Sequence, residues 1–193
     1  SLTGRQAWNR LFDEILGAAR FSFNSEELTE QEVLSKLYGA ERAMRELAAQ
    51  SLTDGLQQRL RQLTFIFNII LADKTSDDRL RDYPHWLSSR NLANEVSAET
   101  VQALIEAVSG RYDLVARYYN LKKKLLGLEE LYDYDRYAPL EKVEVFFPWE
   151  RARETVLKAF GSFHPVMESV ARNFFELEWI DAPIQPGKMG GAF

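Results

Sequence analysis

The sequence predicts a mainly α protein, a multi-helix, bundle-like array of about six or seven helices with at most a small strand element. Good helix formers (Ala, Leu, Arg, Gln and Glu) dominate residues 40–82. Apolar side chains recur at spacings of three, four and seven in several stretches, which is the period of a helix with one buried face. At 193 residues, with 46% hydrophobic and 27% charged residues, the chain can bury a sizeable core.

The first helix is predicted over residues 4–20, and residues 21–28 form a loop or a short extended piece. Thr29 followed by Glu32 is a capping box that begins a short amphipathic helix, which stops near Gly39. The helical region 40–82 has one expected break, at Asp54-Gly55, and a kink, a helix cap and a turn are all open there because a glycine inside a helix costs only about 1 kcal/mol. One apolar face of the first helix is made by a regular series of residues: Trp8, Leu11, Phe12, Ile15, Leu16 and Ala19.

Tyr83-Pro84 ends this region, because the residue before a proline avoids the helical conformation. A short helix or turn over residues 88–96 precedes a long helix that Ser97 caps and Gly127 ends. One stripe of this long helix is predicted to face a core. If Leu104 is buried there, a Leu104→Ala change is expected to lower the free energy of unfolding by about 2–5 kcal/mol. The stripe comprises Val101, Leu104, Ile105, Val108, Tyr112, Val115 and Tyr119.

The last third contains the one convincing strand candidate, Val143–Phe147. Pro148 then opens a helix that Gly161 ends, and His164-Pro165 opens the last helix. Residues 179–193, rich in Gly and Pro, are expected to be irregular or extended.

The overall charge and composition disfavour several classes of partner. The net charge of −5 argues against nucleic-acid binding, which usually needs a basic face. No apolar run approaches the roughly 18 residues that span a bilayer, so we expect no membrane partner. The absence of cysteine excludes disulfides and thiolate metal sites.

Candidate catalytic and metal-binding side chains are few. Neither of the two histidines, His85 and His164, begins a His-Glu-x-x-His motif, and Glu168 four residues after His164 is a weak partner, so no metal ligand and no catalytic residue is predicted. An acidic turn could supply an acid and a base or bind a cation, but we expect a solvated loop in which Asp135 caps or pairs with a nearby arginine. This acidic turn comprises Glu129, Glu130, Asp133 and Asp135.

A run of three lysines, Lys122, Lys123 and Lys124, is expected to be solvated.

Several motifs nevertheless resemble the oligoendopeptidase F branch of the thimet-oligopeptidase-like zinc peptidases. They are Tyr118-Tyr119-x-Leu-Lys122-x-x-Leu-Leu-Gly127, Tyr134-Asp135-x-x-Ala138-Pro139-Leu140, Ser89-Arg90-Asn91 and Trp179-Ile-Asp181 followed by Gly187-Lys188. Their shared order and spacing, more than any single motif, carry the resemblance.

The resemblance implies that residues 1–82 form an amino-terminal helical region and residues 83–193 the truncated start of a peptidase catalytic domain. The parent would be a cytoplasmic zinc endopeptidase of short peptides, whereas this fragment would lack zinc and be inactive. Gly190, Gly191, Ala192 and Phe193 match the start of the family's substrate-binding strand. The sequence leaves the oligomeric state open, and the competing hypothesis is a stand-alone helical protein-interaction module without catalytic activity.

Overall fold

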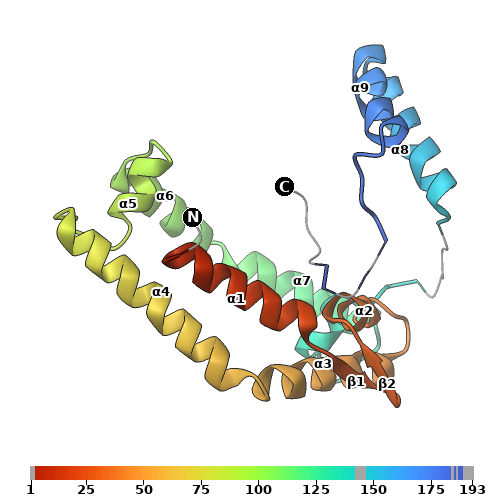
Figure 1. Ribbon diagram of the computed structural model, residues 1–193. Helices are drawn as coiled ribbons and strands as arrows, with labels where there is room; N and C mark the ends of the chain where they lie inside the picture. Colours follow the sequence, from red (N-terminus) through yellow and green to blue (C-terminus); the bar gives the residue numbers. More distant parts are fainter. Residues whose placement is uncertain (1–2, 142–146, 184, 186, 189–193) are drawn as a thin grey trace. The chain divides into compact units, whose positions relative to one another are not determined.

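The computed structural model describes residues 3–141, 147–183, 185, 187 and 188, and these residues confirm a mainly α fold (Figure 1). Within them are nine α-helices, α1 to α9, and one two-stranded sheet. This count exceeds the expected six or seven, because two long helical regions are each divided. The chain forms two compact units, Ser1–Leu140 with Pro186–Phe193, and Glu141–Gln185.

The first unit begins with α1 (Arg5–Ala18), which packs on α4 (Leu60–Leu80). The region expected to be a loop or extended piece is a hairpin of β1 (Phe21–Phe23) and β2 (Glu26–Leu28). Asn24 and Ser25 both have positive φ, as the tight turn of a two-residue hairpin requires. In the predicted strand Val143–Phe147, residues 143–146 lie outside the described residues, and Phe147 is not in a strand.

The hairpin and the next two helices, α2 (Glu30–Lys36) and α3 (Arg42–Gln57), enclose a small core. The predicted capping box is confirmed: the Thr29 N–H donates to Glu32 Oε2 at 2.7 Å, and the Glu32 N–H donates to Thr29 Oγ1 at 3.4 Å. This fixes the start of α2 and so places Val33 in the core. The fully or almost fully buried core residues are Ala19, Phe21, Phe23, Val33 and Ala48.

The helical region 40–82 divides between α3 and α4 at Gln58-Arg59, so the break predicted at Asp54-Gly55 is wrong. Gly55 lies inside α3, where a Cβ atom would be 2.4 Å from a ring carbon of Phe21. The glycine thus serves close packing of the hairpin on the helix, rather than a turn.

After α5 (Ser88–Ala93), the predicted long helix is two helices, α6 (Ala98–Ser109) and α7 (Tyr112–Leu125), with Gly110 as the C-cap of α6. Both predicted ends are confirmed. Ser97 Oγ accepts from the Thr100 N–H at 3.1 Å, and Gly127 follows α7 with φ 66°.

The predicted burial of the apolar stripe is wrong for this chain. Leu104 is 64% exposed, and other members of the stripe are also exposed: Ile105, Val108, Tyr112 and Val115. The periodicity correctly indicated a helix with an apolar face. It could not show that none of the described residues covers this face.

The second unit is a hairpin of α8 (Trp149–Phe163) and α9 (Pro165–Glu176), which pack on each other. His164 is the C-cap of α8 and the N-cap of α9, so α8 continues two residues past its predicted end at Gly161. In the described part of the chain, no helix has the length and apolar character needed to cross a membrane.

Candidate functional site

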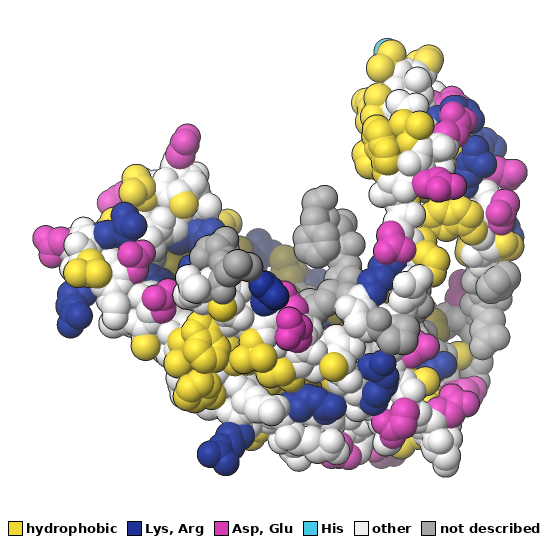
Figure 2. Space-filling view, viewed as in Figure 1, with side chains coloured by type: hydrophobic (Ala, Val, Ile, Leu, Met, Phe, Trp, Pro, Cys, Tyr) yellow, Lys and Arg dark blue, Asp and Glu magenta, His cyan; other side chains and the backbone are white. Residues whose placement is uncertain are grey.

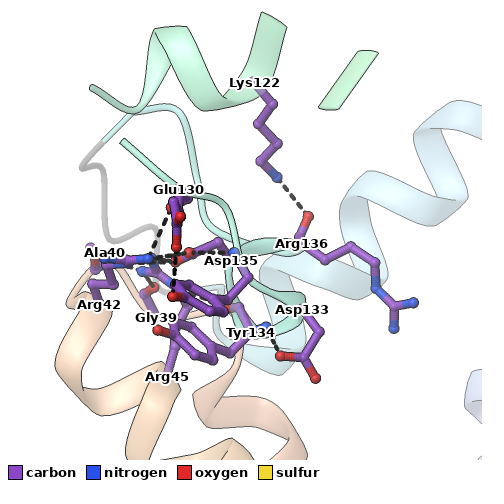
Figure 3. Close-up of polar contacts among 11 residues, drawn as sticks. Gly39, Ala40, Arg42, Arg45, Lys122, Glu130, Asp133, Tyr134, Asp135 and Arg136 are labelled. Carbon is purple, nitrogen blue, oxygen red and sulfur yellow. Dashed lines mark hydrogen bonds and ion pairs between the residues drawn. The ribbon is translucent and has the colours of Figure 1, made fainter. Parts of the chain in front are cut away.

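Asp135 is the only member of the acidic turn that the fold buries, and it lies in the short 3-10 helix η1 (Asp133–Asp135). Its carboxylate accepts hydrogen bonds from Arg42 Nη2 at 2.9 Å and from Arg45 Nη2 at 2.9 Å (Figure 3). The Tyr132 N–H donates to the same carboxylate at 3.2 Å. These contacts confirm that Asp135 both caps the turn and pairs with arginine.

Arg45 extends this pairing into a three-way connection. Its Nη1 atom donates to the carbonyl oxygens of Gly39 at 2.8 Å and Ala40 at 2.9 Å, and its Nε atom donates to that of Tyr134 at 3.2 Å. The side chain is almost fully buried. One guanidinium therefore holds together the segment before α3, the helix itself and the acidic turn. The turn lies about 90 residues further along the chain.

The charge state of Asp135 follows from these contacts. Burial alone raises the pKa of a carboxyl, but the hydrogen bonds from Arg42, Arg45 and the Tyr132 N–H outweigh it and lower the pKa of Asp135. The group is an ionised acceptor whose two oxygens are already occupied. It is therefore a structural residue, which disfavours the acid–base and cation-binding hypotheses for this turn.

Lys122 corrects the expectation of a solvated lysine run, since it is only 7% exposed. Its Nζ atom donates to the carbonyl oxygen of Arg136 at 2.6 Å and so joins α7 to the acidic turn (Figure 3). Burial and the positive charge of Arg45 lower the pKa of Lys122, partly offset by Asp135.

The two histidines have local structural roles. His164 Nδ1 accepts from the Val166 N–H at 3.1 Å as the cap of α9, and His85 Nδ1 accepts from the Leu87 N–H at 3.2 Å. Glu168 pairs with Arg172. Among the described residues, no three His, Asp or Glu side chains are close enough to hold a metal ion.

The α8/α9 hairpin carries an apolar groove of about 580 Å³ along one side. Figure 2 shows hydrophobic side chains gathered on this side of the hairpin and charged side chains on the other. The groove is lined mainly by large apolar side chains, among them Trp149, Val156, Phe160, Met167, Val170 and Phe174.

The predicted substrate-binding residues Gly190, Gly191, Ala192 and Phe193 lie outside the described residues, so their role stays a prediction. The nearest described residues are Gly187 and Lys188, which belong to the first unit. Gly187 has φ 80°.

Sequence reasoning missed Arg42 and Arg45. A weak signal was present, because the two arginines are three residues apart and so share one face of α3. Nothing in the local sequence identified Asp135 as their partner.

Comparison with known proteins finds relatives that are named as oligopeptidases or oligoendopeptidases. Group B oligopeptidase PepB of Streptococcus agalactiae is 30% identical over 170 residues, which cover 86% of this chain and 28% of the relative. An oligoendopeptidase F homolog of Borreliella burgdorferi is 30% identical over 131 residues, 65% of this chain and 22% of the relative. The chain is related to the oligoendopeptidase F peptidases. No family model matches the chain.

Solved structures agree with this relationship at the level of fold. PZ peptidase A matches with a TM-score of 0.86 and 17% identity, over 97% of this chain and 34% of that one. Oligoendopeptidase-F from Enterococcus faecium matches with a TM-score of 0.67 and 19% identity, over 95% of this chain and 41% of that one.

The chain spans less than a third of the length of the curated oligoendopeptidase F relatives that it matches. The predicted division of the chain at residues 82/83 lies inside the first unit, between α4 and α5. That division describes the organisation of the larger family and stays a prediction.

Proposed function

We propose that this chain is a fragment of a cytoplasmic, zinc-dependent oligopeptidase that hydrolyses short peptides. The observation that carries the proposal is the 30% identity to group B oligopeptidase PepB across 86% of the chain. In this proposal the described residues are helical scaffold, and the zinc ligands and catalytic residues come from other parts of the parent protein. Bound zinc would polarise the scissile carbonyl.

Two surfaces of the chain support membership of a larger fold. The apolar stripe shared by α6 and α7 is exposed, and the α8/α9 hairpin exposes a second apolar face. Soluble monomers rarely leave large contiguous apolar surfaces in water. Further parts of a longer peptidase would cover such faces.

The part of this chain proposed to meet substrate is Gly190, Gly191, Ala192 and Phe193. An extended peptide binds an exposed strand edge through main-chain hydrogen bonds, and these are independent of side-chain identity. Glycines at such an edge allow the two backbones to approach closely. This proposal rests on the match of these residues to the family's motif.

The test of the proposed function is the zinc content of two purified proteins, the full-length product of the gene and the 193-residue chain. We expect one tightly bound zinc per full-length protein and no submicromolar zinc binding by the chain, which has too few suitable ligands. The reading frame should also encode His-Glu-x-x-His within about 50 residues after Phe193. Stoichiometric, submicromolar zinc binding by the chain, or a full-length protein without zinc, would contradict the proposal.

The second candidate function is a stand-alone helical interaction module, and the α8/α9 groove favours it. A groove of about 580 Å³ with apolar walls has the character of a surface that accepts an amphipathic helix. A stop codon shortly after the codon for Phe193 would favour this module over the peptidase. A long open reading frame with the zinc motif would exclude it.

A further inference from the structure

Three consecutive residues of the acidic turn, Tyr134, Asp135 and Arg136, are held by cationic side chains from two helices (Figure 3). Arg45 of α3 donates to the Tyr134 carbonyl oxygen at 3.2 Å and to the Asp135 carboxylate at 2.9 Å. Lys122 of α7 donates to the Arg136 carbonyl oxygen at 2.6 Å. The two carbonyls on either side of Asp135 are therefore bound by different helices, one by α3 and the other by α7.

The charges gathered at this turn do not balance. Arg42, Arg45 and Lys122 are three cations, whereas Asp135 is the only buried carboxylate in the described part of the chain. Lys122 is 7% exposed, and Arg45 and Asp135 are buried more deeply, so water screens these charges poorly. Burial and Arg45 lower the pKa of Lys122 while Asp135 raises it, as expected for a lysine that lies within the field of both groups. A buried cation is costly without a counter-ion, so Lys122 depends on the charge of Asp135 as well as on its carbonyl acceptor.

The turn has little backbone structure of its own. The Asp135 and Arg136 N–H groups each donate to a carbonyl oxygen three residues earlier, at 3.0 Å. A single isolated turn of helix is marginal in water, because fixing its backbone costs more free energy than one or two hydrogen bonds return. The side chains of α3 and α7 therefore determine whether the turn stays in place. These helices come from different regions of the chain, α3 from residues 1–82 and α7 from residues 83–193.

We propose that Asp135 is the shared counter-ion of α3 and α7, and that the two helices hold the turn as one cooperative joint between residues 1–82 and residues 83–193. Neutralising Asp135 releases Arg42 and Arg45 directly and leaves Lys122 beside Arg45 without a buried anion. Breaking the Lys122 contact frees the other end of the same short turn, and so weakens the hold of α3 on Asp135. The joint consists of described residues of this chain and does not depend on the proposed peptidase function.

The first test is a double-mutant cycle in the 193-residue chain, measured by urea denaturation. Lys122→Met should raise the equilibrium constant for unfolding about tenfold in wild type, because a charge-assisted hydrogen bond is lost. In the Asp135→Asn background the same change should raise it less than about twofold, because the lysine there no longer has its anion. The control is Lys124→Met, which places the same side chain at an exposed position of α7 and should change it less than about twofold in both backgrounds. A tenfold effect of Lys122→Met in both backgrounds would overturn the shared counter-ion.

The second test needs only single variants, and it remains decisive if Asp135→Asn does not fold. Amide hydrogen exchange of Asp135 and Arg136 is followed by NMR in the 193-residue chain. Lys122→Met on the α7 side and Arg42→Met on the α3 side should each speed exchange of both amides about tenfold, because a cooperative unit opens as a whole. Lys124→Met should leave both amides at their wild-type rates. An unchanged rate at the Asp135 amide in Lys122→Met would show that the two helices hold the turn independently, and would overturn the inference.

Discussion

Replacing Asp135 by Asn is expected to lower the free energy of unfolding of the first unit by about 3–5 kcal/mol. The substitution removes the charge and one acceptor oxygen from a fully buried group and leaves Arg45 buried without its counter-ion. Arg42 and Arg45 together join α3 to the acidic turn through this one carboxylate. Urea denaturation followed by circular dichroism measures the loss.

The pH dependence of the free energy of unfolding tests whether the negative charge of Asp135 is what stabilises the fold. Because its folded pKa is lowered, its contribution to stability is fully present above the unfolded pKa of about 3.9 and is lost as the pH falls through the folded pKa. Asp135→Asn should therefore lose less stability than wild type as the pH falls below about 4.

The control for the loss of stability caused by Asp135→Asn is Asp77→Asn, which breaks an exposed Arg81–Asp77 pair and should lower the free energy of unfolding by less than about 1 kcal/mol. Equal losses for the two variants would show that the buried pair is not a main stabilising contact.

Replacing Leu104 by Ala should have different effects in two contexts. In the 193-residue chain the side chain is 64% exposed, and the loss of stability should be below about 0.5 kcal/mol. In the full-length protein, where we propose that the stripe on α6 is covered, the loss should be about 2–5 kcal/mol. Chemical denaturation of both proteins measures the difference.

The control for this comparison is Val33→Ala. Val33 is fully buried in the core between the β-hairpin, α2 and α3, so the change should destabilise both proteins by similar amounts. A Leu104→Ala loss as small in the full-length protein as in the chain would mean that the stripe stays exposed there.

The features that the sequence predicted well depend on residues within a few positions of one another. The Thr29–Glu32 capping box, the Ser97 cap and the Gly127 stop are each determined by a single turn of chain. The resemblance to oligoendopeptidase F is also readable in the sequence, because it consists of motifs in a shared order.

The features that the sequence did not predict depend on distant partners. Gly55 reads locally as a helix break, yet it is glycine because Phe21 packs against it. Lys122 reads as one of three solvated lysines, yet it reaches the Arg136 carbonyl across a turn. The apolar stripe on α6 and α7 was predicted to be buried, yet it is exposed. Periodicity in the sequence reveals an apolar helix face but does not show which part of the protein covers it.

The most direct test of the peptidase assignment is hydrolysis of a short internally quenched peptide by the purified full-length protein and by the 193-residue chain. We expect the full-length protein to cleave the peptide, to lose that activity with a zinc chelator and to regain it when zinc is restored, while the chain alone is inactive. A full-length protein without metal-dependent cleavage, or metal-dependent cleavage by the chain alone, would contradict the account.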